Sequence, residues 1–345
     1  LVVENHTGDV IPDYGNFSSV LAGGSIYLEA GRKYRLRVEY AFITETGFPF
    51  LQLLHLPPYV PADGLSRAVQ AAANADLAIV IAGNPDGYET EGTDRPSMRL
   101  PGSQDALITE VARANPRTIV VVQAGSPIEM PWADEVPAIL WEYYPGQEGG
   151  SALADLLTGK VSPSGRLPMS LPCRLEDDPT FVNYPGDQSL LYGEGIFIGY
   201  RNYDLRQMKV LFPFGHGLSY TRFEYSDLRC PESFHAGEKV EISFTVRNSG
   251  KVTGAEVAQV YVRDVQSSVQ RPIRELKGFS RVCLGAGEET RVSIQLDEHA
   301  FSYYDQDRHA WVMEPGYFEI EVGSSSRDIR LKGSLRLEKE GVGLS

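Results

Sequence analysis

The sequence has little positive charge and no long hydrophobic run. Its 345 residues include 32 Lys and Arg against 46 Asp and Glu, which gives a formal net charge of -14. A nucleic-acid or anionic-membrane surface needs clustered basic residues, so neither partner is expected. No apolar run approaches the roughly 20 residues that a membrane-spanning helix requires. The sequence therefore predicts no nucleic-acid partner and no membrane partner.

Several motifs of catalysis and cofactor binding are missing as well. No Gly-x-Gly-x-x-Gly follows a predicted strand, and no Gly-x-x-x-x-Gly-Lys-Ser/Thr loop occurs, so nucleotide binding is not expected. The histidines form no His-x-x-x-His pair and the acidic residues lack the calcium-loop ladder, which argues against zinc and calcium. Ser126 follows Gly125, but Ile128 stands where a nucleophile elbow needs glycine. No cofactor and no metal are predicted.

Cysteine is scarce, and the three that occur lie far apart without metal-ligand spacing. They are Cys173, Cys230 and Cys283. We expect partly buried free thiols, although a single disulfide stays open. The sequence starts at Leu1 without a signal peptide, so we expect a fragment or a processed piece. Two triplets, at Asn5 and Asn16, match the glycosylation acceptor pattern, which leaves both an extracellular and a cytoplasmic location open.

The length predicts two or three domains. Residues 1–56 alternate apolar and polar side chains with period two and are predicted as the tail of a β module. Residues 57–221 alternate helices and strands, which predicts an α/β domain with a mostly parallel sheet, extended by an ordered excursion over 160–220. Residues 222–345 carry about seven short alternating strands, typical of an immunoglobulin-like or fibronectin-type sandwich.

The expected elements follow from hydrophobic periodicity and turn residues. Strands of the β module are expected at 25–29, 34–40 and 48–56. In the α/β domain we expect helices over 64–75, 103–115 and 149–158, and strands over 76–82, 118–122 and 137–141. The second helix is expected to begin after Ser103 as its N-cap. The sandwich strands are expected at 239–247, 255–263, 289–297 and 317–322.

One acidic loop stands out at Asn84–Arg95. It follows an apolar run, Asp76–Gly83, that is predicted as a buried parallel strand. The loop carries four carboxylates within nine residues: Asp86, Glu89, Glu91 and Asp94. Ligands bind at the carboxyl ends of strands in open α/β sheets, so one of these groups is a candidate for chemistry. On spacing alone, a solvated acidic surface remains the commoner outcome.

A set of motifs in fixed order resembles a known enzyme family. The motifs are Tyr144–Gly150, Ala154–Gly159, Ser162–Pro168, Tyr192–Gly195 with Gly199–Arg201, and Phe212–Tyr220. Together they resemble the carboxy-terminal half of glycoside hydrolase family 3 enzymes, chiefly β-glucosidases. Arg271–Phe279 and Glu314–Phe318 are similar to that family's fibronectin type III-like domain. Residues 1–56 resemble the end of the inserted β module named after anthrax protective antigen.

The resemblance implies a retaining mechanism with two carboxyl groups, a nucleophile and an acid/base. In the subgroup that this sequence resembles, the acid/base Glu lies in a Glu-Gly-x-Asp-Arg motif, which is matched here by Glu91–Arg95. Glu91 is therefore the expected acid/base, with Glu89 as the second candidate. Tyr88, Asp94 and Arg95 are candidates for substrate contact, and ordinary loop packing explains them equally well.

The chain departs from the family because it holds no eight-fold barrel pattern, and the family's nucleophile Asp lies on that barrel. No residue here is assigned as the nucleophile, and the upstream barrel is an expected partner. We expect part of an exo-acting β-glucosidase that releases terminal β-D-glucose from β-glucosides or cello-oligosaccharides, inactive in isolation.

Other functions and the assembly state stay open. A β-xylosidase or another β-glycosidase of the family remains an alternative. A non-catalytic carbohydrate-binding or interaction protein is a second alternative, and homo-oligomerisation is undecided. A sheet that lacks its first strands is expected to expose an edge and an apolar face, which favours aggregation.

Overall fold

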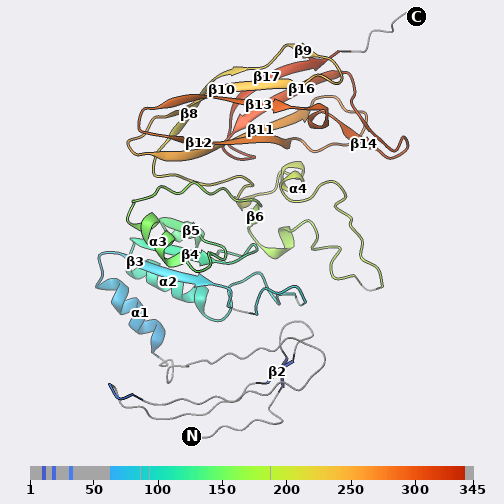
Figure 1. Cartoon of the computed structure of the whole chain (residues 1–345). Coiled ribbons are helices and arrows are strands. Elements are labelled where there is room, and N and C mark those ends of the chain that lie inside the picture. Colours follow the sequence, from blue (N-terminus) through green and yellow to red (C-terminus); the bar gives the residue numbers. More distant parts are fainter. Residues whose placement is uncertain are drawn as a thin grey trace, which may run out of the picture. The chain divides into compact units, whose positions relative to one another are not determined.

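The computed structural model describes residues 10–12, 18–20, 31–33, 63–85, 87–92, 94–186 and 188–338 (Figure 1). The chain divides into two compact units, one of residues 1–125 and 134–143 and the other of residues 126–133 and 144–345. Near the start, β1 (Val10–Pro12) pairs antiparallel with β2 (Ser18–Val20). The strands expected at 25–29, 34–40 and 48–56, and both acceptor asparagines, Asn5 and Asn16, lie outside the described residues. The domain boundaries at residues 57 and 222 stay predictions.

The first unit contains a parallel sheet. Its strands β3 (Ala78–Gly83), β4 (Thr118–Gln123) and β5 (Ala138–Trp141) lie in the order β3-β4-β5. Helix α1 (Gly64–Ala73) precedes β3, and α2 (Gln104–Ala114) connects β3 to β4 and packs against both strands. The predicted parallel α/β region is therefore confirmed, with each element within two residues of its expected bounds.

Asn115 explains how the two helices are held together. It ends α2, and its backbone N–H donates to the carbonyl of Val111. Its buried side-chain amide donates to the carbonyls of Ala72 and Ala75, each at 2.9 Å, so the end of α1 is fixed to the end of α2. Ser103 takes the expected N-cap position of α2, but its side chain makes no capping hydrogen bond.

The expectation that β3 is a fully buried strand is wrong for one of its faces. Val80 and Ala82 are buried, whereas the side chains of Ile79 and Ile81 are 45% and 57% exposed. β3 is the edge strand of the described sheet, and the face that carries Ile79 and Ile81 is left partly uncovered. Exposed isoleucines on an edge strand are the apolar surface that the sequence led us to expect.

The second unit includes helix α3 (Gly149–Leu157) and a long excursion over 160–220. The described part of the excursion holds only short elements, as predicted. They are β6 (Leu171–Pro172), the 3₁₀ turn η2 (Leu175–Asp177), α4 (Tyr200–Leu205) and β7 (Val210–Phe212). β6 and β7 pair antiparallel, so the two ends of the excursion lie side by side.

The remainder of the second unit is a sandwich of two sheets, as predicted (Figure 1). One sheet has the order β13-β10-β8 and the other the order β12-β11-β16-β17-β9. The strands are β8 (Phe223–Arg229), β9 (Ser233–Phe234), β10 (Val240–Asn248), β11 (Gly254–Asp264), β12 (Glu275–Leu284), β13 (Glu289–Leu296), β16 (Gly316–Gly323) and β17 (Ile329–Leu337). Buried side chains from both sheets, including Phe244, Val260 and Phe318, form one core.

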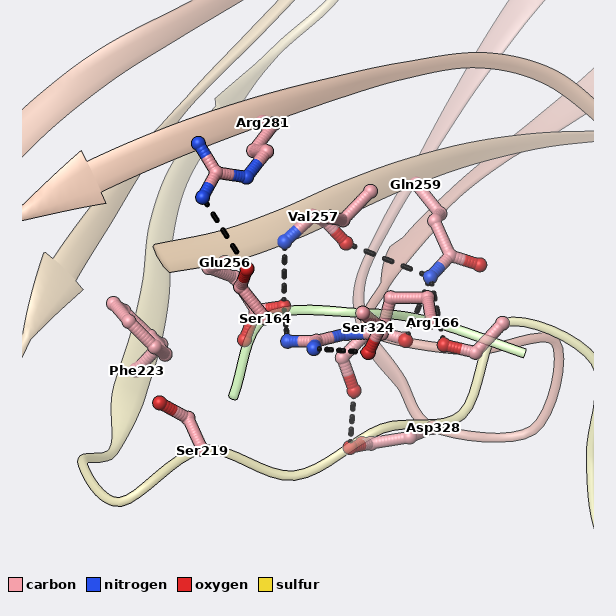
Figure 2. A network of polar contacts seen from close by, with 12 residues as sticks. Ser164, Arg166, Ser219, Phe223, Glu256, Val257, Gln259, Arg281, Ser324 and Asp328 are labelled. Atoms are coloured by element: carbon pink, nitrogen blue, oxygen red, sulfur yellow. Dashed lines mark hydrogen bonds and ion pairs between the residues drawn. The ribbon is translucent and has the colours of Figure 1, made fainter. Parts of the chain in front are cut away.

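The excursion is joined to the sandwich by buried polar contacts (Figure 2). Arg166 of the excursion pairs with Glu256 of β11 at 2.6 Å, and their side chains are only 7% and 4% exposed. On the same strand, the amide of Gln259 donates to the carbonyl of Gly215 at 3.1 Å and to that of Ser324 at 2.7 Å. Because buried polar groups cost free energy when unpaired, these contacts fix how the excursion lies on β11.

His216 lies beside this network and should make stability depend on pH. Its ring stacks on Phe212 at 5.2 Å, and burial, reinforced by the nearby charge of Arg166, lowers its pKa below the usual 6.5, although Asp328 opposes the shift. The unfolded chain therefore binds a proton that the folded chain resists. We expect the free energy of unfolding to decrease as pH falls below about 6.5, and His216→Phe, which keeps the stacking, to weaken this dependence. Urea unfolding of both proteins between pH 7.5 and 5 checks this. The same change of unfolding free energy with pH in the wild type and in His216→Phe would contradict it.

The three cysteines are free thiols, as expected. Cys173 and Cys230 are half-buried, whereas Cys283 is exposed, so the expectation of partial burial is wrong for Cys283. The thiol of Cys230 donates to the carbonyl of Ser334 at 3.7 Å, and burial raises its pKa.

Candidate active site

The acidic loop leaves the carboxyl end of β3 in a fixed direction. The N–H of Asn84 donates to the carbonyl of Gln123 at 2.9 Å, which extends the β3–β4 ladder one residue beyond the strand. Gln104, the first residue of α2, accepts from the N–H of Gly83 at 2.8 Å and donates to its carbonyl at 2.9 Å. Both ends of the loop between β3 and α2 are therefore joined at Gly83.

Gly83 has no room for a side chain, so its substitution should disturb the loop. A Cβ added there would overlap the carbonyl oxygen of Gln123 in β4. We expect Gly83→Ala to lower the free energy of unfolding by about 1–3 kcal/mol because the strand ends must move apart. Gly150→Ala in α3 is the control, since its added Cβ meets nothing within 4 Å and alanine favours a helix. Urea unfolding of both variants checks this. Equal free energies of unfolding for Gly83→Ala and Gly150→Ala would contradict it.

Glu89 is the anchored carboxylate of the loop. Its Oε2 accepts from the N–H of Gly125, just beyond β4, at 2.8 Å. Its Oε1 lies 3.5 Å from Nη1 of Arg95, and the two side chains are only 12% and 15% exposed. Two of the residues predicted for the site, Glu89 and Arg95, are therefore brought together, and their contacts hold the loop against the end of β4.

Glu91 differs from Glu89 in its surroundings. Glu91 is exposed, and among the described residues no hydrogen bond or ion pair holds its carboxylate. Asp94 is exposed as well, whereas Tyr88 is half-buried and closes a turn through its N–H to the carbonyl of Pro85 at 3.0 Å. Asp86 lies outside the described residues. The loop is therefore anchored through Glu89, whereas Glu91 is exposed.

The carboxyl end of β5 supplies polar residues that sequence reasoning missed. Glu142 accepts from the side-chain amide of Gln123 at 2.9 Å, beside the end of β4. Tyr143 has a φ of 55°, a costly conformation for a residue with a bulky side chain, and its buried hydroxyl has no hydrogen-bond partner among the described residues. Burial raises its pKa. Their position in the sequence could have identified them, because both residues directly follow the third apolar strand, as the acidic loop follows the first.

The loop offers two carboxyl groups in different surroundings. One carboxylate is held by a backbone N–H and an arginine, and a second is open to a bound molecule. Over the described ranges, no group of three His, Cys, Asp or Glu side chains could hold a metal ion. Over the same ranges, no helix is both long and apolar enough to cross a membrane. A carboxyl group that serves as acid/base gains proton affinity when a partner surface or a nearby negative charge surrounds it.

Comparison with protein families gives two matches along the chain. Residues 5–220 match the glycosyl hydrolase family 3 C-terminal domain. Residues 256–326 match the fibronectin type III-like domain. The first match extends through the acidic loop and the excursion, and the second lies within the sandwich.

Individual relatives agree with these matches. The chain is 42% identical over 353 residues to thermostable β-glucosidase B of Acetivibrio thermocellus, covering 98% of this chain and 47% of that protein. The β-glucosidase of Kluyveromyces marxianus, solved in complex with glucose, superposes with a TM-score of 0.78 at 41% identity, covering 82% of this chain and 34% of that one. A family 3 β-glucosidase of Bifidobacterium adolescentis gives a TM-score of 0.78 at 40% identity, covering 83% and 43%. The chain thus spans less than half the length of these relatives.

Proposed function

Because this chain belongs to glycosyl hydrolase family 3, we propose that it acts as the carboxy-terminal part of a retaining β-glucosidase. The reaction is hydrolysis of terminal β-D-glucose from β-glucosides or cello-oligosaccharides. The observation that carries the proposal is 42% identity to a β-glucosidase along 98% of this chain. Glucose bound in the Kluyveromyces marxianus relative supports a glucoside as the substrate.

In this proposal Glu91 is the acid/base. Its carboxyl group protonates the glycosidic oxygen as the bond to the anomeric carbon breaks, and its carboxylate then removes a proton from the attacking water. The exposed position of Glu91 supports this role, because the carboxylate is available to a substrate. Glu89 is assigned to holding the loop through Gly125 and Arg95. Tyr88 and Asp94 are proposed to contact the sugar or its aglycone.

The nucleophile must come from outside this chain, which yields a direct test. We expect the purified chain to hydrolyse an aryl β-glucoside negligibly, because one of two required carboxyl groups is absent. Joining it to an upstream barrel domain of a family 3 relative should restore turnover with retention of configuration, followed by NMR of the released sugar. Turnover by the isolated chain that vanished in Glu91→Gln would contradict the division of roles. Faster hydrolysis of an aryl β-xyloside than of the β-glucoside would indicate a β-xylosidase instead.

A further inference from the structure

A β-hairpin at one end of the sandwich exposes two large aromatic side chains. Its strands are β14 (Tyr303–Asp305) and β15 (Ala310–Val312), which pair antiparallel (Figure 1). Tyr304 and Trp311 are directly opposite each other, with ring centroids 5.7 Å apart at an interplanar angle of 75°. They are 49% and 57% exposed. His299 packs against Trp311 at 5.4 Å and is exposed too, so the three rings form one surface, which we call the aromatic face.

The opposite face of the hairpin is fixed to the sandwich. The hydroxyl of Tyr303 donates to Glu314 at 3.2 Å, and Glu314 also accepts from the N–H of Ser268 at 2.9 Å. The guanidinium of Arg271 lies 5.9 Å from the centre of the Tyr303 ring. These contacts hold the strand that carries Tyr304, so the aromatic face is ordered before any ligand arrives. A preorganised surface loses little conformational freedom on binding.

The turn of the hairpin is fixed as well. Asp305 accepts from the N–H groups of Asp307 and Arg308, each at 3.0 Å. The Arg308 guanidinium lies 3.3 Å from the other carboxylate oxygen of Asp305, which neutralises this charge locally. Asp305 therefore does not present an uncompensated charge beside the aromatic face, which leaves the face open to an uncharged ligand.

We propose that the aromatic face is a binding site for β-linked gluco-oligosaccharides, separate from the Glu91 loop. A β-glucopyranose ring carries its hydroxyls equatorially, which leaves C–H groups on both faces of the ring. Such a face packs on an aromatic ring while the hydroxyls at its rim remain available to water and to polar side chains. Glucose as the sugar rests on the proposed function; the binding surface itself rests on Tyr304, Trp311 and His299.

The size of the aromatic face favours a sugar over a protein. A stable protein interface buries about 800 Å² on each partner, which requires many more side chains than one hairpin presents. Two half-exposed rings with an imidazole beside them match one or two sugar rings. A long glucan could bind there while one of its ends is processed elsewhere, so the site would matter for polymers and not for short substrates.

The test is direct binding of cellopentaose to the full chain. Trp132 is buried and Trp141 half-buried, so Trp311, which is 57% exposed, should dominate changes in tryptophan fluorescence. We expect cellopentaose to shift the emission of the wild-type chain to shorter wavelength, with a matching affinity by calorimetry. Trp311→Ala should weaken binding roughly tenfold or more, since one stacked ring is lost. Tyr304→Ser, which keeps Trp311 and its contact with His299, should weaken binding to a smaller extent.

A matched control is Phe279→Ala on β12, because Phe279 is 68% exposed and lies outside the hairpin. Thermal unfolding checks that each variant remains folded. Absence of cellopentaose binding by the wild-type chain, or equal binding by Trp311→Ala and Phe279→Ala, would overturn the proposal. The proposed function is tested separately, because Glu91→Gln should bind cellopentaose at the aromatic face as the wild type does, and Trp311→Ala in a complete enzyme should hydrolyse an aryl β-glucoside normally.

Discussion

Glu91→Gln, in a complete enzyme that contains this chain, is expected to lower kcat/KM for cellobiose by about 10²–10⁴-fold. Glutamine fills the same space but cannot protonate the glycosidic oxygen, and glucose is a poor leaving group without that proton. Dinitrophenolate leaves without protonation, so kcat/KM for dinitrophenyl β-glucoside should fall far less. Comparing kcat/KM across aryl β-glucosides of increasing leaving-group pKa measures the effect. A loss of kcat/KM that does not depend on the leaving group would contradict the role of Glu91 as proton donor.

The second half of the reaction gives an independent measurement. In Glu91→Ala no carboxylate remains to activate water, so hydrolysis of the glycosyl-enzyme should become rate-limiting. Azide needs no such base and fits the space that alanine leaves. Added azide should therefore raise kcat for dinitrophenyl β-glucoside and yield β-glucosyl azide. Lack of any azide effect on this variant would count against Glu91 as the base.

Glu89→Gln is the control for Glu91→Gln. Glutamine can still accept from the N–H of Gly125, but it loses the charge that faces Arg95. We expect a moderate loss that is the same for every leaving group, because the loop shifts while the proton donor remains. If only Glu89→Gln responds to leaving-group pKa, the acid/base role passes to Glu89.

Arg166→Met should strongly lower the stability of the second unit. It removes the cation that pairs with Glu256 at 2.6 Å and leaves a carboxylate that is only 4% exposed. Breaking one partner of a buried pair costs about 3–5 kcal/mol. The excursion is joined to β11 through this pair (Figure 2), so it should separate from the sandwich first. Urea unfolding gives the free energy, and proteolysis within residues 160–220 reports the separation.

Two further variants show whether burial of the ion pair causes the loss of stability in Arg166→Met. The double variant Arg166→Met with Glu256→Leu replaces both charges by apolar groups and should recover most of the lost stability. Lys160→Met breaks an exposed pair with Asp155 that is 2.9 Å long, and Lys160 is 70% exposed. Its expected cost is below about 1 kcal/mol because water screens both charges. A double variant as unstable as Arg166→Met would contradict this account.

Local pattern was sufficient for the fold class. Apolar runs between helical segments predicted the parallel strands β3, β4 and β5, and period-two alternation predicted the sandwich strands. The reason is that hydrophobic periodicity reports which face of an element is buried. Motif order identified the family, and the motif around Glu91 selected one carboxylate among four neighbours. Each element and each motif is read from residues that lie close together in the sequence, and the family follows from the order of the motifs along the chain.

Tertiary structure decided what depends on residues distant in sequence. Glu89 and Glu91 are two positions apart, yet only Glu89 meets Gly125, 36 residues later, so one is anchored and the other exposed. Ile79 and Ile81 of β3 are exposed although the continuous apolar run around them predicted a buried strand, because burial depends on which elements cover each face. Arg166 and Glu256, 90 residues apart, become a buried pair only because the excursion lies on β11. Residue types and local periods were determined by the sequence alone, whereas burial and pairing across long loops were decided by the fold.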